Sequence, residues 1–304
     1  MWIMPYKPRF ESIELLMLKF LNSRICLSPT EKQHYFTLKK GYEGEVLFDS
    51  LTETLQCECL ILNDLLLKHN NTHFQIDSII IMPTKIYVFE VKNFEGDYNY
   101  ESDRLYKLPN TEVTNPLNQL NRCELLLRQL LQTLGFNIPI HASVVFINPE
   151  FTLYQLPLNK PFILPTQVNS YLKKLNKNAS TLNKKHIKLA DTLISHHIED
   201  SPFKQLPSYE YEQLQKGITC GSCTSISVSI EGKLCVCREC GNEEAVEAGV
   251  LRSVKEFKLL FPERKITTNA IHEWCKIVNS KKRIQRILNK NFTLLGVHQW
   301  AYYE

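Results

Sequence analysis

The chain has 304 residues, of which 43% are hydrophobic and 22% are charged, so it can bury at least one sizeable core. No apolar run approaches the roughly 18–20 residues of a membrane span. The apolar N-terminal stretch is interrupted by charged residues and has no small-residue cleavage site, which argues against a signal peptide. We therefore expect a soluble, cytoplasmic protein without a membrane partner.

Cysteine usage and charge distribution narrow the class further. The ten cysteines form one metal-like cluster and several scattered single residues, which suits a reducing compartment better than a disulfide scaffold. Residues 242–304 hold 11 Lys/Arg and 7 Asp/Glu, whereas residues 1–241 hold 25 of each. The whole net charge of +4 therefore lies in the C-terminal fifth of the chain.

Two helices are predicted near the N-terminus. The first covers residues 11–23, and the second follows a cap at Ser28-Pro29-Thr30 and ends near Leu55. The second helix contains Gly41 and Gly44, although a glycine in a helix interior costs about 0.8–1 kcal/mol relative to alanine. We therefore expect another backbone or a ligand to approach closely beside Glu45. The alternative is that Glu45 is a solvated acid on the helix surface.

Three strands are predicted next, at residues 58–66, 74–82 and 85–94, because polar turns separate these apolar runs. An antiparallel meander is the simplest topology for them. Residues 96–108 are expected to form a further hairpin on the edge of this sheet.

A strong helix and a buried strand complete the predicted sheet. The helix starts at Asn115-Pro116 and runs to about Leu134, where Gly135 stops it, and the strand covers residues 140–147. A helix, three strands, a helix and a strand predict an α/β sandwich of about 110 residues.

Residues 151–216 are predicted to be a helical extension and linker, because prolines interrupt the first part and lysine and asparagine are frequent in the second. Helices are expected at residues 166–176 and 183–198. The pair His196-His197 fits a solvated helix end better than a metal site.

The third predicted strand carries an acid and a base within an apolar run. Side chains alternate between the faces of a strand, so Glu90 and Lys92 project from the same face, roughly 6–7 Å apart. Burying two charges costs several kcal/mol unless they are paired or metal-bound. Asp77 lies on the preceding strand, and together these residues predict a metal-dependent phosphodiesterase site. The alternative is a structural ion pair between Glu90 and Lys92.

An ordered set of motifs over about residues 38–150 resembles the NERD (nuclease-related) domain, a family within the PD-(D/E)xK nuclease fold. Five elements in order make this resemblance specific, because a lone Glu-x-Lys triplet arises often by chance. They are Gly41-x-x-Gly44-Glu45, Asn63-Asp64, Gln75-Ile76-Asp77, Phe89-Glu90-Val91-Lys92-Asn93 and Asn115-Pro116-x-x-Gln119.

The resemblance implies a restriction-endonuclease-like fold, with a mixed sheet flanked by helices, and a role for each catalytic candidate. Asp77 and Glu90 are expected to bind Mg²⁺ or Mn²⁺, because hard oxygen ligands suit hard cations. Glu45 is expected to complete or support that metal site. Lys92 is expected to orient or activate the attacking water, and Gln119 to position the water or the backbone.

A second metal site is predicted from cysteine spacing. Two Cys-x-x-Cys pairs with a 13-residue spacer are typical of a zinc ribbon, whose strands bring the pairs together around one structural Zn²⁺. The four ligands are Cys220, Cys223, Cys237 and Cys240. Cys235 is expected to face away from the ion, and folding of so small a module depends on the metal.

The C-terminal segment resembles a winged-helix module. Helices are expected at residues 243–260, at 269–278 and from Ser280 to about residue 290, followed by a strand-like hairpin. The third helix has one apolar side and five basic residues, a combination that suits the major groove and phosphates of nucleic acid. These residues are Lys281, Lys282, Arg283, Arg286 and Lys290. The alternative is a solvated charged face on a partner-binding module.

The sequence therefore predicts a metal-dependent nuclease that hydrolyses DNA and carries C-terminal nucleic-acid-binding modules. The alternatives are a non-cleaving nucleic-acid-binding protein and a protein-interaction adaptor that retain the nuclease fold. Five segments are expected: an N-terminal helical extension (1–37), the NERD-like domain (38–150), the helical extension and linker (151–216), the zinc ribbon (217–242) and the winged-helix-like basic module (243–304).

Overall fold

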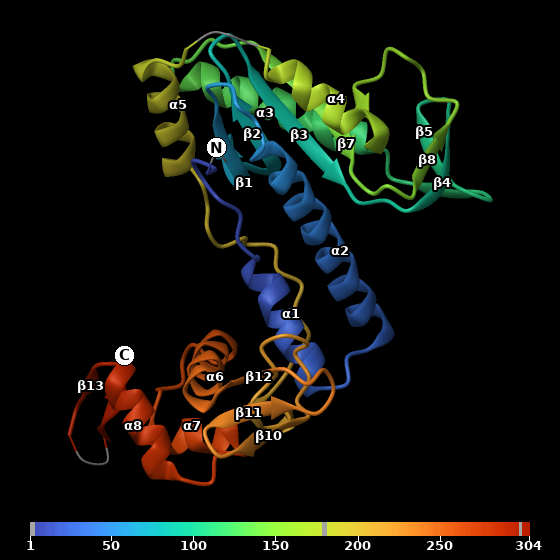
Figure 1. Cartoon of the computed structure of the whole chain (residues 1–304). Helices are drawn as coiled ribbons and strands as arrows, with labels where there is room; N and C mark the ends of the chain where they lie inside the picture. Colours follow the sequence, from blue (N-terminus) through green and yellow to red (C-terminus); the bar gives the residue numbers. More distant parts are fainter. Residues whose placement is uncertain (1–3, 178–180, 298–299) are drawn as a thin grey trace. The chain divides into compact units, whose positions relative to one another are not determined.

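The computed structural model describes residues 4–177, 181–297 and 300–304 (Figure 1). The chain forms two compact units. The first unit comprises Met1–Glu11 and Thr37–Phe203, and the second comprises Ser12–Phe36 and Lys204–Glu304. The predicted N-terminal extension is thus divided between the two units, and the five predicted segments are a finer division that stays a prediction.

A five-stranded mixed sheet forms the centre of the first unit, in the order β1-β2-β3-β7-β9. Strands β1 (Leu60–His69), β2 (Thr72–Ile81) and β3 (Ile86–Lys92) form the predicted antiparallel meander. Strand β7 (Ile140–Phe146) pairs in parallel with β3, and β9 (Phe162–Ile163) pairs in parallel with β7. The mixed sheet predicted from the motifs is confirmed.

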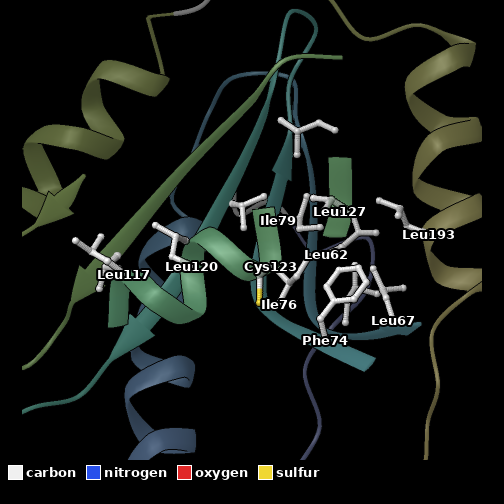
Figure 2. Close-up of a cluster of buried hydrophobic side chains, with 14 of the residues drawn as sticks. Leu62, Leu67, Phe74, Ile76, Ile79, Leu117, Leu120, Cys123, Leu127 and Leu193 are labelled. Carbon is white, nitrogen blue, oxygen red and sulfur yellow. The ribbon is translucent and has the colours of Figure 1, made fainter. Parts of the chain in front are cut away.

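Helices cover both faces of this sheet. Helices α3 (Pro116–Thr133) and α5 (Lys184–Ser195) pack on one face, where Leu127 and Leu193 meet side chains of β1 and β2 (Figure 2). On the other face, α4 (Pro165–Leu175) and the C-terminal half of α2 (Pro29–Thr52) bury a second apolar cluster against the sheet. Burial on both faces explains why these strands are nearly continuously apolar.

The helix ends follow the predicted capping rules. The Asn115 side chain accepts a hydrogen bond from the Leu117 amide at 3.0 Å, and Gly135 has a φ of +79° just after α3.

The two histidines after α5 differ in their surroundings. His197 Nδ1 accepts a hydrogen bond from the Leu66 amide at 3.1 Å. His197 is therefore tied to β1 as a hydrogen-bond acceptor, so the predicted solvated helix end applies only to His196, which is exposed.

The hairpin predicted for the edge of the main sheet lies in a separate sheet, so that prediction is wrong. Strands β4 (Gly96–Glu101), β5 (Arg104–Lys107) and β6 (Thr111–Val113) join β8 (Phe151–Tyr154) in the order β6-β5-β4-β8. Strand β8 was not predicted. It pairs in parallel with β4. The Phe151 ring of β8 stacks on the Phe146 ring of β7, with the ring centroids 4.1 Å apart.

A buried ion pair explains why residues 12–36 belong to the second unit. Arg24, at the end of α1 (Ile13–Arg24), donates to Glu256 Oε1 at 2.6 Å and to Oε2 at 2.8 Å. Both side chains are fully buried, and the guanidinium lies 4.0 Å from the Trp274 ring centroid. Such a buried pair is costly to break, because removing one partner leaves an uncompensated charge. It therefore fixes α1 to α6 (Val246–Leu260).

The zinc-ribbon segment of the second unit is a three-stranded antiparallel sheet. Strands β10 (Val228–Glu231) and β11 (Leu234–Cys237) form the predicted hairpin. A third strand, β12 (Glu243–Ala245), pairs with β11 where the sequence analysis placed the start of a helix, so α6 begins only at Val246. A short 3₁₀ helix at Tyr211–Gln213 precedes the ribbon.

Three helices and a two-stranded sheet follow the ribbon. Helix α6 is followed by α7 (Thr268–Cys275) and α8 (Lys281–Asn291), and Ser280 caps α8 as predicted. Strands β13 (Leu294–Leu295) and β14 (Tyr302–Tyr303) pair antiparallel, and Tyr303 also bridges to Ile266 between α6 and α7. Part of the predicted wing, residues 298–299, lies outside the described residues. Assignment to the winged-helix class stays a prediction.

Candidate active site and metal centre

The candidate site lies where strands β2 and β3 separate, a place that we call the β2–β3 fork. Their pairing ends at Ser78 and Phe89, just before the two acids that the motif analysis selected. Beyond this point, Asp77 Oδ2 accepts a hydrogen bond from the Val91 amide at 2.7 Å. The Asp77 side chain therefore replaces a ladder hydrogen bond, which holds a carboxylate in the sheet with only 5% of the residue exposed.

The other neighbour of β2 is also distorted at this level. The β1–β2 ladder pairs Asn63 with Ser78 and Leu65 with Ile76, but it skips Asp64 and Asp77. Asp64 has a φ of +55°, a conformation that Asp tolerates better than most residues. Asp77 is thus released from regular pairing on both sides.

Glu90 and Lys92 lie on the same side of β3, as alternation along a strand requires. The Lys92 ammonium forms an ion pair with Glu90 Oε1 at 2.6 Å. Lys92 Nζ also donates to Gln119 Oε1 on α3 at 3.2 Å. The structure therefore brings Glu90, Lys92 and Gln119 into one row.

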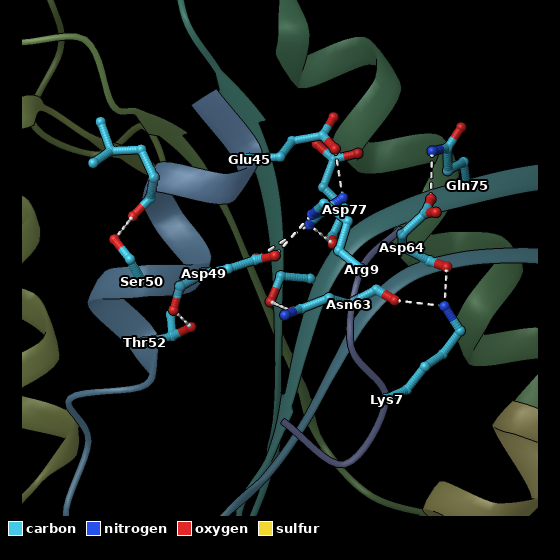
Figure 3. A network of polar contacts seen from close by, with 12 residues as sticks. Lys7, Arg9, Glu45, Asp49, Ser50, Thr52, Asn63, Asp64, Gln75 and Asp77 are labelled. Atoms are coloured by element: carbon cyan, nitrogen blue, oxygen red, sulfur yellow. Dashed lines mark hydrogen bonds and ion pairs between the residues drawn. The ribbon is translucent and has the colours of Figure 1, made fainter. Parts of the chain in front are cut away.

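Helix α2 carries Glu45 to the same site, where Arg9 connects Glu45, Asp49 and the backbone of Asp77 (Figure 3). The Arg9 guanidinium forms an ion pair with Glu45 and donates from Nε to Asp49 Oδ2 at 2.8 Å. Its Nη2 also donates to the backbone carbonyl of Asp77 at 2.6 Å. The surface-acid alternative for Glu45 is wrong, because its side chain is only 20% exposed and is paired with a guanidinium that is 3% exposed.

Sequence reasoning missed Arg9 and Asp49. The N-terminal segment runs beside β1: the Lys7 amide donates to Ile61 O at 3.1 Å, and the Asn63 amide donates to Lys7 O at 2.9 Å. The Lys7 ammonium also donates to the backbone carbonyls of Asn63 and Asp64 at 2.8 and 2.7 Å. This pairing delivers Arg9 to the site from a distant part of the chain, and no local pattern indicates it.

The site holds more acids than bases. Glu45, Asp49, Asp77 and Glu90 converge on Arg9 and Lys92, so full ionisation leaves an excess of two negative charges. Burial, reinforced by the charge of Asp77, raises the pKa of both Glu45 and Glu90 to about 8. Burial also raises the pKa of Asp77, although Lys92 and the Val91 amide oppose that shift.

Lys92 is charged at neutral pH in this environment. Burial by itself lowers the pKa of its ammonium, but the nearby Glu90 and Asp77 carboxylates outweigh burial and raise it above the ordinary value. Such a lysine orients ligands and balances negative charge, whereas a lysine with a lowered pKa acts as a base.

The donor set fits a hard divalent cation. Asp77 and Glu90 offer buried carboxylate oxygens in a site with excess negative charge. Among the described residues, only four cysteines form a group of three or more ligand atoms within 4.8 Å of one another. The acids therefore do not form a closed cage, which suits a site that must also admit water and phosphate.

Gly44 allows α2 to approach the end of β3. A Cβ at Gly44 would lie 2.5 Å from the Asn93 Cβ, and Asn93 is fixed because its Nδ2 donates to Lys40 O at 2.8 Å. The predicted close approach beside Glu45 is confirmed for Gly44. It is wrong for Gly41, where an added Cβ meets no atom within 4 Å.

The four predicted zinc ligands converge in the second unit. The Sγ atoms of Cys220 and Cys240 are 3.7 Å apart, and those of Cys223 and Cys237 are 3.6 Å apart. Tetrahedral zinc with Zn–S bonds of about 2.3 Å requires sulfur separations of about 3.8 Å. The cluster therefore fits a zinc ribbon. Cys235 is buried in the apolar core of the second unit and lies outside the cluster, as predicted.

Three of the five basic residues of α8 line a hollow that the zinc-ribbon segment also lines. Arg283, Arg286 and Lys290 line a hollow of about 510 Å³ together with the β10–β11 turn. Arg283 Nη1 donates to the Gly232 carbonyl at 3.0 Å. Lys290 pairs with Glu247 at 2.8 Å, which partly offsets its charge.

The other two basic residues, Lys281 and Lys282, do not line the hollow. Lys281 instead donates to Asn269 Oδ1 on α7 at 3.2 Å.

Comparison with known families gives a match within the first unit. Residues 40–147 match the family model of NERD, the nuclease-related domain, which confirms the resemblance inferred from the motifs. The matched segment includes Glu45, Asp77, Glu90, Lys92 and Gln119. No curated protein and no solved structure gave a match to the chain. Among the described residues, no helix is both long enough and apolar enough to cross a bilayer.

The two glycines of α2 make a matched test of the helix contact. We expect Gly41→Ala to raise the free energy of unfolding by about 0.5–1 kcal/mol, because alanine is the better helix former and meets no obstacle. Gly44→Ala is expected to lower it, since the new methyl group forces α2 away from Asn93. Urea denaturation of both variants measures this. Equal stabilisation by the two substitutions would contradict the contact.

The raised pKa values of Glu45 and Glu90 predict how stability depends on pH. Both acids hold a proton more tightly in the folded protein than in the unfolded chain, so their contribution is complete below about pH 4.5 and is lost as the pH rises to about 8. We therefore expect the melting temperature of the protein, measured without added Mg²⁺ or Mn²⁺, to fall between pH 6 and pH 8.5.

Added Mg²⁺ or Mn²⁺ is expected to raise the melting temperature more at pH 8.5 than at pH 6, because ionised carboxylates bind the cation. Thermal scans of wild type and Glu90→Gln check this. The variant should show a weaker dependence on pH and on metal. A wild-type melting temperature that rises over this range would contradict the assignment.

Proposed function

We propose that the protein is a metal-dependent nuclease that hydrolyses DNA phosphodiester bonds. The observation that carries the proposal is the buried excess of carboxylates at the β2–β3 fork, with the charged Lys92 beside it. A structural ion pair explains Glu90 and Lys92, but it does not explain why Asp77 and Glu45 are buried nearby with raised pKa values. A site that binds a cation explains all four residues.

Asp77 and Glu90 are the proposed ligands of Mg²⁺ or Mn²⁺. When bound, such an ion supplies positive charge at the phosphate and lowers the pKa of bound water. Asp77 is held by the Val91 amide, and Glu90 is held by the Lys92 ammonium. Glu45 supports the site from α2, and its partner Arg9 supports it from the N-terminal segment and lowers the excess of negative charge.

Lys92 and Gln119 are proposed to position the substrate side of the reaction. The ammonium of Lys92 balances negative charge that develops on the phosphate, and it orients the attacking water through its N–H groups. Gln119 Oε1 accepts one of these N–H groups and so fixes the direction of the others. Because its pKa is raised, Lys92 is assigned to orientation and charge balance and not to proton abstraction.

The second unit is proposed to bind nucleic acid. Four thiolates form a closed set of ligands around Zn²⁺, so the ribbon is structural and not catalytic. Helix α8, with Lys281, Lys282, Arg283, Arg286 and Lys290, is the proposed contact to DNA, and the order of elements from α6 to β14 supports the winged-helix assignment. A cytoplasmic location suits the reduced thiols.

Two variants test the catalytic proposal. Lys92→Ala and Asp77→Asn should each lower cleavage of DNA by at least about 100-fold, because each removes charge at the reacting phosphate. Asparagine keeps an oxygen that accepts the Val91 amide, so the fold at Asp77 is retained. Cleavage of linear, nicked, supercoiled and single-stranded DNA and of RNA is measured with Mg²⁺ or Mn²⁺.

Lys39→Ala serves as the control, because Lys39 is an exposed lysine of α2 with only a 3.7 Å ion pair to Glu43. It should cleave like wild type. If wild-type protein leaves every substrate intact, the protein is a non-cleaving binding protein, and the catalytic proposal fails.

Charge-neutralising variants of α8 test the binding proposal. We expect Arg283→Gln with Arg286→Gln to weaken DNA binding at low salt and to reduce the salt dependence by about one phosphate contact per residue. The matched control is Lys255→Gln with Lys258→Gln on α6, where both lysines are exposed. Fluorescence anisotropy with labelled DNA measures both. Equal binding by both double variants, or no binding by wild type, would favour the adaptor.

A further inference from the structure

A groove of about 870 Å³ lies in the first unit between β2 and the first half of α3. We call it the α3–β2 groove. Six of its lining residues carry the argument that follows: His73, Gln75, Asn118, Gln119, Arg122 and Phe203.

The α3–β2 groove adjoins the candidate active site. Gln119 lines it and also accepts the hydrogen bond from Lys92 Nζ at 3.2 Å. Gln75 lines it two residues before Asp77 on β2, and its Nε2 donates to Asp64 Oδ1 at 2.8 Å (Figure 3). A ligand in the groove therefore reaches the residues that flank the proposed metal ligands.

The lining mixes polar and apolar side chains and carries little charge. None of its twelve residues is acidic, and Arg122 is its one arginine or lysine. Amide side chains of Gln75, Asn118 and Gln119 offer both donors and acceptors, which match the edges of unpaired bases. Double-stranded DNA, with its dense phosphates, is bound by many cations instead.

An exposed aromatic pair lies at this groove. Phe203 is 65% exposed, and its ring meets His73 edge-on, with the centroids 5.4 Å apart and the planes at 80°. Aromatic side chains in this setting stack on bases, and each base stacked contributes about 1–3 kcal/mol. Arg122 Nη2 donates to the His73 carbonyl at 3.4 Å, and a guanidinium has five N–H groups in all.

We propose that the α3–β2 groove binds an unpaired nucleic-acid strand next to the bond to be cut. Phe203 stacks on a base beside His73, Arg122 contacts a phosphate, and the amides contact base edges. The link to cleavage rests on the proposed nuclease function, whereas the binding of a single strand does not. Substrates with a free or frayed strand are then preferred over intact duplex.

Binding measurements test the groove without cleavage. Short labelled oligonucleotides are added without Mg²⁺ or Mn²⁺, in the Arg283→Gln, Arg286→Gln background, which weakens the proposed binding by α8. Phe203→Ala is expected to weaken binding of single strands by about 5- to 150-fold, as loss of one stacked base predicts. Arg122→Gln should weaken it several-fold, and neither variant should change binding of a blunt hairpin duplex.

Matched controls come from the same chain. Phe36→Ala removes another exposed aromatic ring, and Arg128→Gln removes an arginine of α3 that pairs with Glu124 outside the groove. Both should bind single strands like the parent protein. Separate DNA and RNA oligonucleotides decide which sugar the groove accepts.

A second readout locates the strand directly. Oligonucleotides that contain 5-iodouracil are photocrosslinked and mapped by mass spectrometry, and crosslinks are expected at His73 or Phe203. Crosslinks elsewhere only, or unchanged single-strand affinity in Phe203→Ala, would overturn the proposal. If the crosslinks appear but no substrate is cut, the groove assignment holds and the nuclease proposal fails.

Discussion

The buried excess of negative charge at the β2–β3 fork is the constraint on which the first unit depends. Four carboxylates converge there on two cations, so the folded protein must protonate some of them or bind a cation. The surrounding elements are arranged to tolerate this charge. Arg9 is brought in by an N-terminal segment paired to β1, and Gly44 lets α2 place Glu45 close to the end of β3. A packed apolar core on both faces of the sheet offsets the cost of holding the acids.

The two candidate metal sites follow opposite designs. The thiolates of the ribbon approach one another closely enough to enclose an ion and leave no position free, which suits a structural role. Within the part of the chain that the structure describes, the acids of the fork form no such cage, and they lie next to a charged lysine and the α3–β2 groove. A hydrolytic site requires free coordination positions, because water and phosphate must reach the cation. The chain thus has a candidate structural metal site in one unit and a proposed catalytic metal site in the other.

Sequence patterns predicted the elements that local chemistry controls. Apolar runs identified β1, β2, β3 and β7, and capping residues such as Asn115 and Ser280 marked where helices begin. Predictions failed where a partner from elsewhere in the chain decides the outcome. The hairpin after β3 joins the unforeseen β8 and not the main sheet, and β12 forms because β11 offers it a free edge. Gly41 and Gly44 look equivalent in sequence, but only Gly44 faces Asn93.

By itself, the sequence determined the nuclease-related motif, the Cys-x-x-Cys pairs and the basic C-terminal helix, because their meaning lies in residue type and spacing. The tertiary structure alone decided what surrounds them. Arg9 joins the site through backbone pairing of a segment that carries no signal, and Asp49 on α2 joins it by pairing with Arg9. Arg24 ties α1 to α6 across 232 positions. The electrostatic state of Lys92 also depends on which carboxylates fold against it. Burial and long-range pairing set these features, and neither is written in a local stretch of sequence.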